Sequence, residues 1–275
     1  MAIHQSAIID KRAEIGKDNE IGPNVIINGP AQIGDNNIID AGAIISGRAV
    51  IGNNNHVYSY ALIGHDPQDV SFKGGETRTI LGSRNTVREF VTIHRATRDD
   101  SVTQIGDDNY LMAYSHIAHD TRVGSNNYFT NCASAAGYSE IGNNIFISFA
   151  VGIHQFSKIG SYSIIGALSK IVQDIPPFMI VDGHPAMVHG INVIGLKRNG
   201  FSPDRRVLLK RAYMQLYRSG ASIKSSLIEL ENMLEDAESS EQAADLKMLI
   251  EFIRNSKRGI ILKAPTEGTL KVTEI

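Results

Sequence analysis

The chain has 275 residues, a single cysteine and a formal net charge of −2. The near-balanced charge excludes a globally basic nucleic-acid binder, and one cysteine excludes an intrachain disulfide framework. No apolar run is long enough to cross a bilayer and no basic-then-apolar leader precedes the first repeat, so we expect a cytoplasmic protein without a transmembrane segment.

Large aliphatic residues recur every six positions, and we call these positions the six-residue frame. Of the 29 frame positions from Ile3 to Ile171, only four lack a large apolar side chain, namely Asp69, Gly75, Asp99 and Ala135. This period is neither the 3.6 of a helix nor the 2 of a half-buried strand, and it is typical of the hexapeptide parallel β-helix. Three units close one triangular coil, so residues 18 apart should lie about 4.8 Å from each other on neighbouring coils.

The positions beside each frame residue also repeat. Two positions earlier the chain carries small residues or asparagine, such as Ala31 and Asn37, which we expect to face the narrow interior. Glycine often follows the frame residue, as Gly34 and Gly52 do, and we expect these glycines to turn the corners of the coil.

Two segments leave the frame, namely residues 64–80 and 94–104. Both are polar and lack inward aliphatic side chains at their frame positions 69, 75 and 99. We expect them to be loops extruded from the prism, and loops on a rigid scaffold are where binding groups concentrate.

A helical segment is predicted after the repeats. Pro176 and Pro177 mark the boundary, because proline cannot continue a hydrogen-bonded coil. The sequence therefore predicts a β-helix domain over 1–189 and a helical domain over 190–275, whose helices cover the open end of the β-helix.

Three helices are predicted within that segment. Ser202 and Pro203 indicate an N-cap and first helical residue, and Gly220 indicates the end of that helix. Further helical patterns run through 222–236 and 240–256, and we expect the last dozen residues to be loosely ordered.

Charge is unevenly distributed over these helices. The stretch from Lys197 to Arg218 contains seven basic residues and one acidic residue, Asp204. The stretch from Glu229 to Glu251 is strongly acidic. One interpretation is a pair of solvated helices with complementary faces, and the other is a docking surface for an acidic partner or a phosphate group.

Four histidines lie beside the frame rather than in it. His94 and His154 directly follow a frame residue, His119 comes two positions after one, and His116 comes one before. All four are therefore expected to project outward. If the second loop adds one hexapeptide to its coil, His94 lies one coil from position 118 and His154 lies two coils from it. These positions then line one outer edge of the prism. The alternative is a set of unrelated surface histidines.

Acyl transfer fits these residues better than metal binding. His116 and His119 would lie about 10 Å apart in an extended chain, too far to chelate one ion without a sharp corner, so no metal is predicted. Asp120 adjoins His119 and could orient an imidazole that accepts a proton from a hydroxyl. Gly137 lies 18 residues beyond His119, where its N–H could face an anionic tetrahedral intermediate, unless it merely turns a corner.

Several segments resemble a known family. They are MAYSHIAHD (112–120), VTIHRAT (91–97), VGIHQF (151–156), VQDIPPF (172–178) and GINVIGLKRNGF (190–201). Together they closely resemble the UDP-N-acetylglucosamine O-acyltransferase family, the first enzyme of lipid A synthesis, over about residues 1–220. The resemblance implies a left-handed parallel β-helix with a C-terminal α-helical domain, a homotrimer with active sites between subunits, a Gram-negative-type bacterium and no cofactor.

The resemblance also implies roles for individual residues. His119 is the general base that deprotonates the glucosamine 3-hydroxyl of the UDP-sugar, Asp120 supports it, and the Gly137 amide is the oxyanion donor. The acyl donor is acyl carrier protein carrying a (R)-3-hydroxyacyl thioester, and its acidic surface suits the basic stretch from Lys197. Substrate-binding positions are Gln68, Asp69, His94 and His116 near the sugar and reacting groups, and His154, Gln155, Asn192 and Arg198 near the nucleotide or cleft.

An acyl-length ruler is implied near Gly166 and Ala167. Family members with long-chain preference often carry two glycines there, so Ala167 could shorten the slot by about one methyl group. The chain departs from the family at Tyr138, where a histidine is frequent, at Ser71, where a lysine is expected, and at Ile194, where a glutamate is expected.

These departures leave open whether the acceptor carries a 3-hydroxyl or a 3-amino group. A second alternative is the UDP-3-O-acylglucosamine N-acyltransferase of the same pathway, which normally has a separate N-terminal domain. The frame begins at Ile3 and leaves no room for one. A non-catalytic scaffold or ice-binding solenoid would need a regular outward face, which the histidines and loops interrupt.

Overall fold

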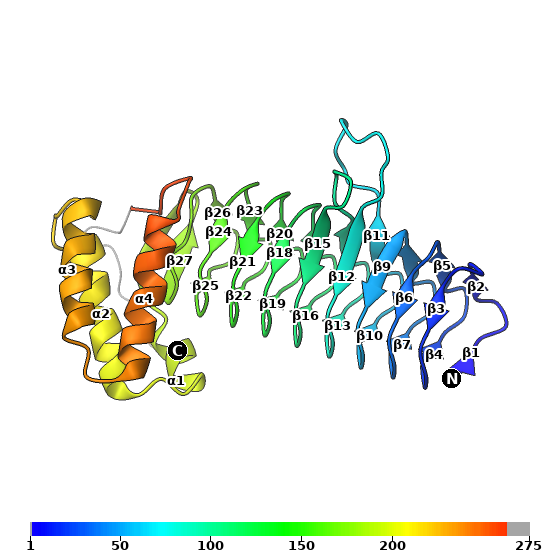
Figure 1. The fold of residues 1–275 in the computed structure, drawn as a ribbon, viewed down its shortest axis with the longest axis horizontal. Helices are drawn as coiled ribbons and strands as arrows, with labels where there is room; N and C mark the ends of the chain where they lie inside the picture. Colours follow the sequence, from blue (N-terminus) through cyan, green and yellow to red (C-terminus); the bar gives the residue numbers. More distant parts are fainter. Residues whose placement is uncertain (1, 263–275) are drawn as a thin grey trace.

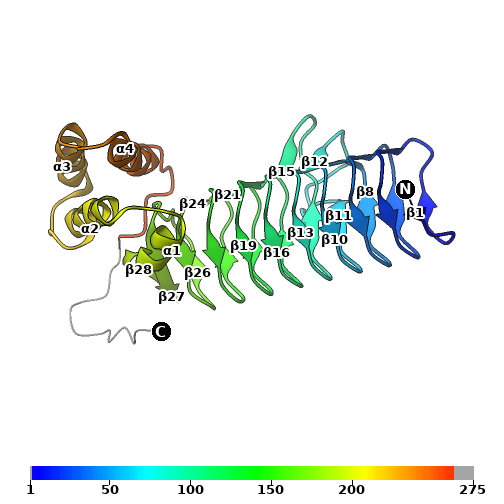
Figure 2. The same ribbon diagram turned by 90° about the horizontal axis from the view of Figure 1, so that it is seen from below.

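The computed structural model describes residues 2–262, which form a long three-sided prism with four helices at its C-terminal end (Figures 1 and 2). The N-terminus lies at the opposite end of the prism. The predicted loose order of the last dozen residues lies outside the described residues.

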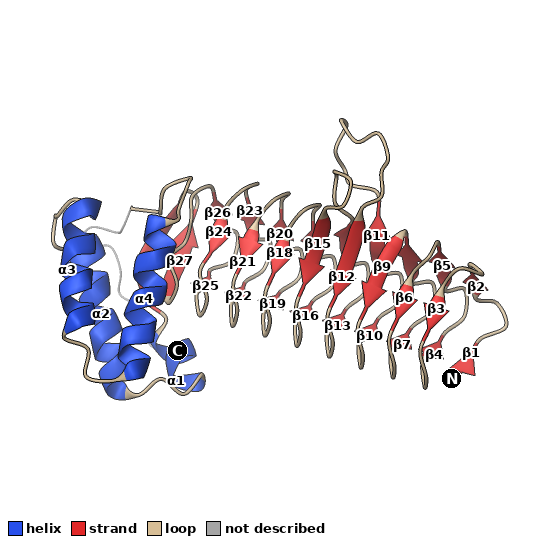
Figure 3. Cartoon of the chain, in the orientation of Figure 1, coloured by secondary structure: helices blue, strands red, loops and turns tan. Residues whose placement is uncertain are grey.

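Each side of the prism is one sheet of short strands (Figure 3). The eleven-stranded sheet contains, in order, β1 (Ala2–Ile3), β4 (Glu20–Ile21), β7 (Ile38–Ile39), β10 (His56–Val57), β13 (Thr86–Val87), β16 (Tyr110–Leu111), β19 (Tyr128–Phe129), β22 (Phe146–Ile147), β25 (Ile164–Ile165), β27 (Met179–Gly183) and β28 (Ala186–Ile191). The nine-stranded sheet contains β2 (Ile8–Ile9), β5 (Ile26–Asn28), β8 (Ile44–Ser46), β11 (Leu62–His65), β14 (Thr92–His94), β17 (His116–Ile117), β20 (Ser134–Ala135), β23 (Gly152–Ile153) and β26 (Lys170–Ile171). The eight-stranded sheet contains β3 (Glu14–Ile15), β6 (Gln32–Ile33), β9 (Arg48–Ile51), β12 (Arg78–Leu81), β15 (Val102–Ile105), β18 (Arg122–Val123), β21 (Glu140–Ile141) and β24 (Lys158–Ile159).

The register of these parallel strands follows the six-residue frame. Ile3 pairs with Ile21, 18 positions later, as the period predicts. Where the two loops leave the frame, the offset grows: Val57 pairs with Val87 and Ile93 pairs with Ile117. The first loop therefore adds 12 residues to a coil (87 − 57 − 18) and the second adds 6 (117 − 93 − 18). Both loops project from the corner between the nine- and eight-stranded sheets (Figure 1).

The interior is the aliphatic column that the frame predicts. Frame residues such as Ile45, Ile63 and Ile117 are fully buried, and Ile3 at the open N-terminal end is 43% exposed. The asparagines two positions earlier are also buried. Each side-chain oxygen accepts the backbone N–H of the equivalent residue on the next coil, as Asn37 does from Asn55 at 2.8 Å and Asn127 does from Ile145 at 2.9 Å. This ladder satisfies the corner amides inside the prism.

The glycines after the frame residues have a different role from the predicted one. The left-handed backbone conformation falls three positions before the frame residue, at Asn36, Tyr60 and their equivalents, and not at Gly34. A Cβ on Gly34 would lie 2.2 Å from Asn53 Oδ1 and 2.8 Å from the Gly52 carbonyl oxygen. Gly34 and the equivalent glycines with ordinary φ are therefore required by the close approach of the next coil rather than by the turn, whereas Gly64 has a left-handed φ of 81°.

The chain past Pro176 and Pro177 forms the last β hairpin and the helical end. β27 still pairs in parallel with β25, and β28 turns back antiparallel to it. The helices follow as α1 (Val193–Arg198), α2 (Pro203–Tyr217), α3 (Ile223–Glu235) and α4 (Ser240–Arg254). Ser202 caps α2 by accepting the Arg205 N–H, which confirms the predicted helix start.

Candidate active site

His119 and Asp120 form a hydrogen-bonded dyad at the corner between the nine- and eight-stranded sheets. His119 Nδ1 lies 2.9 Å from Asp120 Oδ2, and the two side chains are 14% and 7% exposed. With Nδ1 bonded to the carboxylate, Nε2 is the ring nitrogen that remains free to accept a proton. The dyad lies outside the aliphatic column, to which Ile117 of the same coil belongs.

Gly137 lies directly beneath the imidazole. A Cβ at position 137 would lie 2.5 Å from His119 Cε1 and 2.7 Å from Nε2, so no side chain fits there. The left-handed residue of this corner is Tyr138, and Gly137 has no such conformation. Gly137 therefore makes room for the imidazole, and the corner-turning alternative does not account for it.

The Gly137 amide has no hydrogen-bond partner on the neighbouring coil. At a different corner of the prism, the one after the eight-stranded sheet, a side chain of the next coil accepts the N–H at the same place in the repeat, as Asn143 Oδ1 does from Ser125 at 2.7 Å. The next coil offers Gln155 beside Gly137, and within residues 2–262 the buried Gly137 N–H has no acceptor. A free amide beside a basic nitrogen is suited to stabilising an oxyanion.

Asp120 is held by the second loop. Its Oδ2 accepts hydrogen bonds from Thr97 N at 3.0 Å and from Thr97 Oγ1 at 2.7 Å. The Tyr138 hydroxyl lies 2.8 Å from Thr97 Oγ1. Sequence reasoning missed Thr97, because its distance from Asp120 depends on how the loop folds back.

His94 lies on the coil before that of His119, and His116 lies on the same coil as His119, next to His94. Their rings meet edge-on with centroids 4.9 Å apart, and His116 Nδ1 lies 2.7 Å from Thr92 Oγ1. His94 lies outside the aliphatic column and stacks on position 118, as predicted, but it is only 5% exposed. Burial, with the nearby His116, lowers the pKa of His94 to about 4, and burial also lowers the pKa of His116. His94 is therefore neutral near pH 7.

The first loop carries Gln68 and Asp69. Gln68 is exposed, and the Asp69 carboxylate accepts hydrogen bonds from Ser71 N at 2.8 Å and Ser71 Oγ at 2.7 Å. These bonds lower the pKa of Asp69, and a protonated His119 acts in the same direction. Ser71, noted above as a departure from the family, thus orients Asp69.

Arg95 anchors the first loop and was not predicted from sequence. Its guanidinium donates to Asp66 Oδ1 at 2.9 Å and to the Gly75 carbonyl oxygen at 3.1 Å, and it lies 5.1 Å from the centre of the Phe72 ring. Three contacts from one guanidinium hold both ends of the loop against the coil.

His154 and Gln155 lie further along the same edge and are exposed. The His154 Nδ1 lies 3.0 Å from the Gln155 carbonyl oxygen, which also accepts Arg258 Nη1 at 3.2 Å. Arg258 follows α4 and returns to the last coil, where Ile260 pairs with Asp174. The C-terminal segment therefore supports this part of the edge, as sequence reasoning did not foresee.

Asn192 and Arg198 lie on a different side of the prism from His119. They line a groove of about 800 Å³ over the eleven-stranded sheet, together with Tyr128 and Phe146. That sheet is opposite the corner that holds the dyad, so one chain does not bring Arg198 to His119. The Asn192 side chain is buried, accepts Gly195 N–H and donates to the Tyr162 carbonyl oxygen, so it caps α1.

The predicted ruler residues lie at the corner between the eleven- and nine-stranded sheets. Leu111 and His119 belong to the same coil. The coil of Gly166 and Ala167 lies three coils further on, which is about 14 Å along the axis of the prism. A Cβ on Gly166 would lie 2.4 Å from Asp182 Oδ1, whereas Ala167 is exposed. Only position 167 has room for variation in side-chain size.

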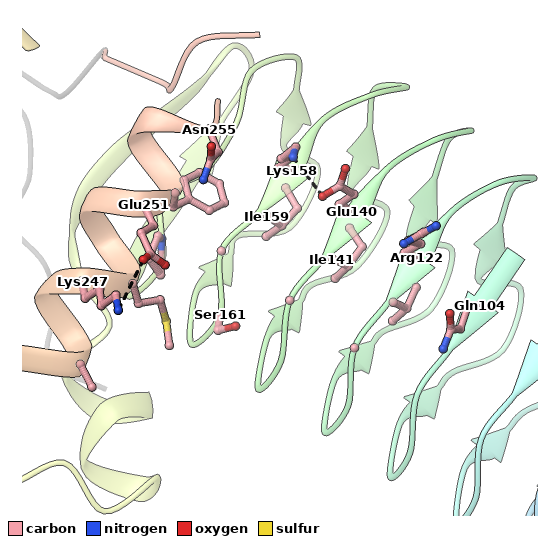
Figure 4. Close-up of a pocket in the computed structure, with 18 residues that line it drawn as sticks. Gln104, Arg122, Glu140, Ile141, Lys158, Ile159, Ser161, Lys247, Glu251 and Asn255 are labelled. Carbon is pink, nitrogen blue, oxygen red and sulfur yellow. Dashed lines mark ion pairs between the residues drawn. The ribbon is translucent and has the colours of Figure 1, made fainter. Parts of the chain in front are cut away.

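A second groove, of about 730 Å³, separates the eight-stranded sheet from α4 (Figure 4). Its sheet side carries alternating charges on Arg122, Glu140 and Lys158, and Glu140 pairs with Lys158 at 3.0 Å. It contains none of the predicted site residues. Within the described part of the chain, no group of three His, Cys, Asp or Glu side chains could hold a metal ion, and no helix is long and apolar enough to cross a membrane.

Comparisons with known proteins agree with this architecture. A family model described as UDP N-acetylglucosamine O-acyltransferase, domain 2, matches residues 174–261, and a bacterial transferase hexapeptide model matches residues 12–47 and 30–65. An acyl-[acyl-carrier-protein]–UDP-N-acetylglucosamine O-acyltransferase of Paraburkholderia phymatum is 45% identical over 260 residues, which cover 94% of this chain and 98% of that protein.

Solved structures give the same result. The UDP-N-acetylglucosamine O-acyltransferase of Moraxella catarrhalis superposes with a TM-score of 0.91 at 39% identity, covering 95% of this chain and 100% of that one. The enzyme of Bacteroides fragilis gives 0.88 at 39% identity, covering 94% and 99%. The predicted left-handed parallel β-helix with a helical C-terminal domain is thereby confirmed. The chain belongs to the UDP-N-acetylglucosamine O-acyltransferase family.

Proposed function

We propose that this protein transfers a (R)-3-hydroxyacyl group from acyl carrier protein to the 3-hydroxyl of UDP-N-acetylglucosamine, the first step of lipid A biosynthesis. The observation that carries the proposal is the His119–Asp120 dyad placed over Gly137, whose N–H has no acceptor within residues 2–262. A base and an oxyanion donor on adjacent coils are the parts that acyl transfer to a hydroxyl requires.

The geometry supports the following sequence of steps. His119 Nε2 takes the proton of the sugar 3-hydroxyl while its oxygen attacks the thioester carbonyl carbon, and the Gly137 N–H stabilises the resulting oxyanion. The intermediate collapses as the C–S bond breaks, and the imidazolium returns its proton to the departing thiolate. The products are the 3-O-acyl sugar nucleotide and acyl carrier protein with a free thiol. Asp120 stabilises the imidazolium in between through its 2.9 Å bond to Nδ1.

The active protein is a homotrimer in this proposal. His119 and Arg198 lie on opposite sides of one prism, so a site that uses both must combine two copies. The eleven-stranded face near Arg198 also exposes large apolar side chains, including Tyr128, Phe146 and Ile194. Such a face is suited to a neighbouring copy.

Acyl carrier protein would dock on α2 and α3. A groove of about 510 Å³ there is lined by Lys210, Arg211, Val207 and Met214, among others, which combines positive charge with exposed apolar side chains. Arg205 does not contribute, because it forms two 2.8 Å bonds with the Asp245 carboxylate. Arg205 thus fits the interpretation that the helices have complementary charged faces. The exposed basic residues Lys210 and Arg211 fit the interpretation that the surface docks an acidic partner. A thioester donor of this kind places the reaction in the cytoplasm.

The test is incubation of the purified protein with UDP-N-acetylglucosamine and a ladder of acyl-carrier thioesters, with mass analysis of the product. One added 3-hydroxyacyl group, released by mild base as expected for an ester, is the predicted result. A parallel reaction with the 3-amino sugar nucleotide addresses the alternative acceptor. If a base-stable amide forms faster with that substrate than the ester forms with UDP-N-acetylglucosamine, the assignment of a 3-hydroxyl acceptor is wrong. If only UDP-3-O-acylglucosamine is acylated, the protein is the N-acyltransferase.

A further inference from the structure

We propose that Thr97 and Tyr138 are positioning residues that hold the Asp120 carboxylate against His119 through a directed chain of hydrogen bonds. The inference rests on the proposed role of His119 as general base. It assigns a function to Thr97 of the second loop and to the tyrosine that stands where the family frequently has a histidine.

The direction of the chain follows from proton counting. Asp120 is an acceptor, so the 2.7 Å contact with Thr97 Oγ1 uses the only hydroxyl proton of Thr97. The 2.8 Å contact between Thr97 Oγ1 and the Tyr138 hydroxyl must then be donated by Tyr138. The chain therefore runs from Tyr138 to Thr97 to Asp120, and His119 Nδ1 donates to the same Asp120 oxygen from the other side.

Tyr138 is fixed independently of this chain. Its backbone is the left-handed residue of the corner, with φ of 61°. Its ring stacks on Phe156 with centroids 4.9 Å apart and meets the His119 ring edge-on at 5.3 Å. Two ring contacts and a constrained backbone aim the hydroxyl at Thr97, so little entropy is lost when the bond forms.

Thr97 connects the second loop to the dyad. Both its N–H and its hydroxyl donate to Asp120 Oδ2, so the loop and the carboxylate hold each other in place. The Asp120 N–H in turn donates to Thr103 Oγ1 at 2.8 Å, on the returning strand β15. Asp120 is thus bonded through its carboxylate to the second loop and through its N–H to the strand that follows the loop.

The chain has a consequence for pH dependence. The charged or titratable groups around His119 are Asp69 from the first loop, His94, His116, Asp120 and Tyr138. Donors on Asp120 disperse its negative charge, so removing one concentrates charge opposite the imidazolium and favours the protonated ring. The acidic limb of the kcat/KM profile should then move to higher pH.

The experiment uses variants that remove single hydroxyl groups. Thr97→Val keeps the shape and the backbone N–H but loses the hydroxyl, and Tyr138→Phe keeps both ring contacts. We expect Thr97→Val to lower kcat roughly tenfold and to move the acidic limb up by about half a pH unit, with a smaller shift in the same direction for Tyr138→Phe. Thr97→Ser should restore the wild-type profile, and Tyr60→Phe, at an exposed corner tyrosine, should leave it unchanged.

A double-mutant cycle separates this proposal from a direct role of Tyr138 in sugar binding. If Tyr138 acts only through the Thr97 hydroxyl, Tyr138→Phe has no further effect in the Thr97→Val background. An undiminished effect there, or a change confined to KM for the sugar nucleotide, would overturn the chain. Wild-type pH profiles for both Thr97→Val and Tyr138→Phe would also overturn the proposed hydrogen-bond chain, provided that His119→Ala is inactive. If His119→Ala is active, the result instead contradicts the proposed role of His119 as general base.

Discussion

The imidazole of His119 occupies the space that a side chain at Gly137 would fill. A Cβ at that position would approach three ring atoms within 2.5–3.0 Å. The two residues are 18 apart in sequence, so this contact is the direct product of one turn of the β-helix. The same turn brings a free amide N–H and a basic nitrogen to one small region of the corner.

Gly137→Ala should displace the imidazole and lower kcat by about 10² or more, because small misplacements of a catalytic group are costly. Gly190→Ala is the matched control, since nothing lies within 4 Å of a Cβ there. Steady-state kinetics of both variants, with circular dichroism for folding, would test this. Equal activity of the two variants would mean that the contact does not position the base.

His119→Ala should keep its fold and assembly and lose about 10²–10⁴-fold in turnover, the range attributed to general base catalysis. Turnover is measured with acyl-carrier thioester and UDP-N-acetylglucosamine, and assembly by light scattering. His4→Ala, at the exposed far end of the prism, serves as the control histidine. Near-normal turnover of His119→Ala would remove this residue from the mechanism.

Mixing two inactive variants tests whether each site is shared between copies. His119→Ala and Arg198→Ala subunits are co-expressed and the mixed oligomers purified. If each site takes His119 from one copy and Arg198 from its neighbour, random mixing restores about a quarter of wild-type activity. Activity no higher than that of the separate variants would place both residues in one subunit's site, against the geometry of a single prism.

The buried His94 should make the protein acid-sensitive. Its pKa is about 4 in the folded protein and near 6.5 when unfolded, so the unfolded state binds more protons between these values. Stability from this group is complete above about pH 6.5 and is lost as pH falls through 4. His116 changes stability in the same direction, because burial lowers its pKa too.

Urea midpoints at fixed protein concentration from pH 7 to pH 4 measure this effect. His94→Asn should show a smaller fall in midpoint than the wild type over that range, while His4→Asn should follow the wild type. Identical curves for His94→Asn and wild type would show that His94 does not titrate differently in the two states.

Ala167→Gly should shift the acyl-length profile toward a longer chain. The residue is exposed at the corner that the implied ruler occupies, whereas Gly166 is already confined by Asp182. Competition among acyl-carrier thioesters of different length, with mass analysis of the products, compares the variant with wild type. An unchanged profile would end the ruler hypothesis for this residue.

The prediction from sequence was most complete where structure repeats locally. Inward positions such as Ile63 and Ile117 follow from the period, and so does the stacking of Gly137 against His119, because no loop lies between them. The corner glycines were located correctly but given the wrong role, since the distance to the next coil is not visible in a single hexapeptide.

The sequence by itself thus determined the prism, its parallel register and the placement of His119 outside the aliphatic column, because a period of six needs only local alternation and a regular rise. Only the tertiary structure decided that His94 is buried, that Thr97 reaches Asp120, and that Arg198 lies on the side opposite His119. These contacts join segments through irregular loops and three different sheets, and no local pattern in the chain records how such segments fold back on one another.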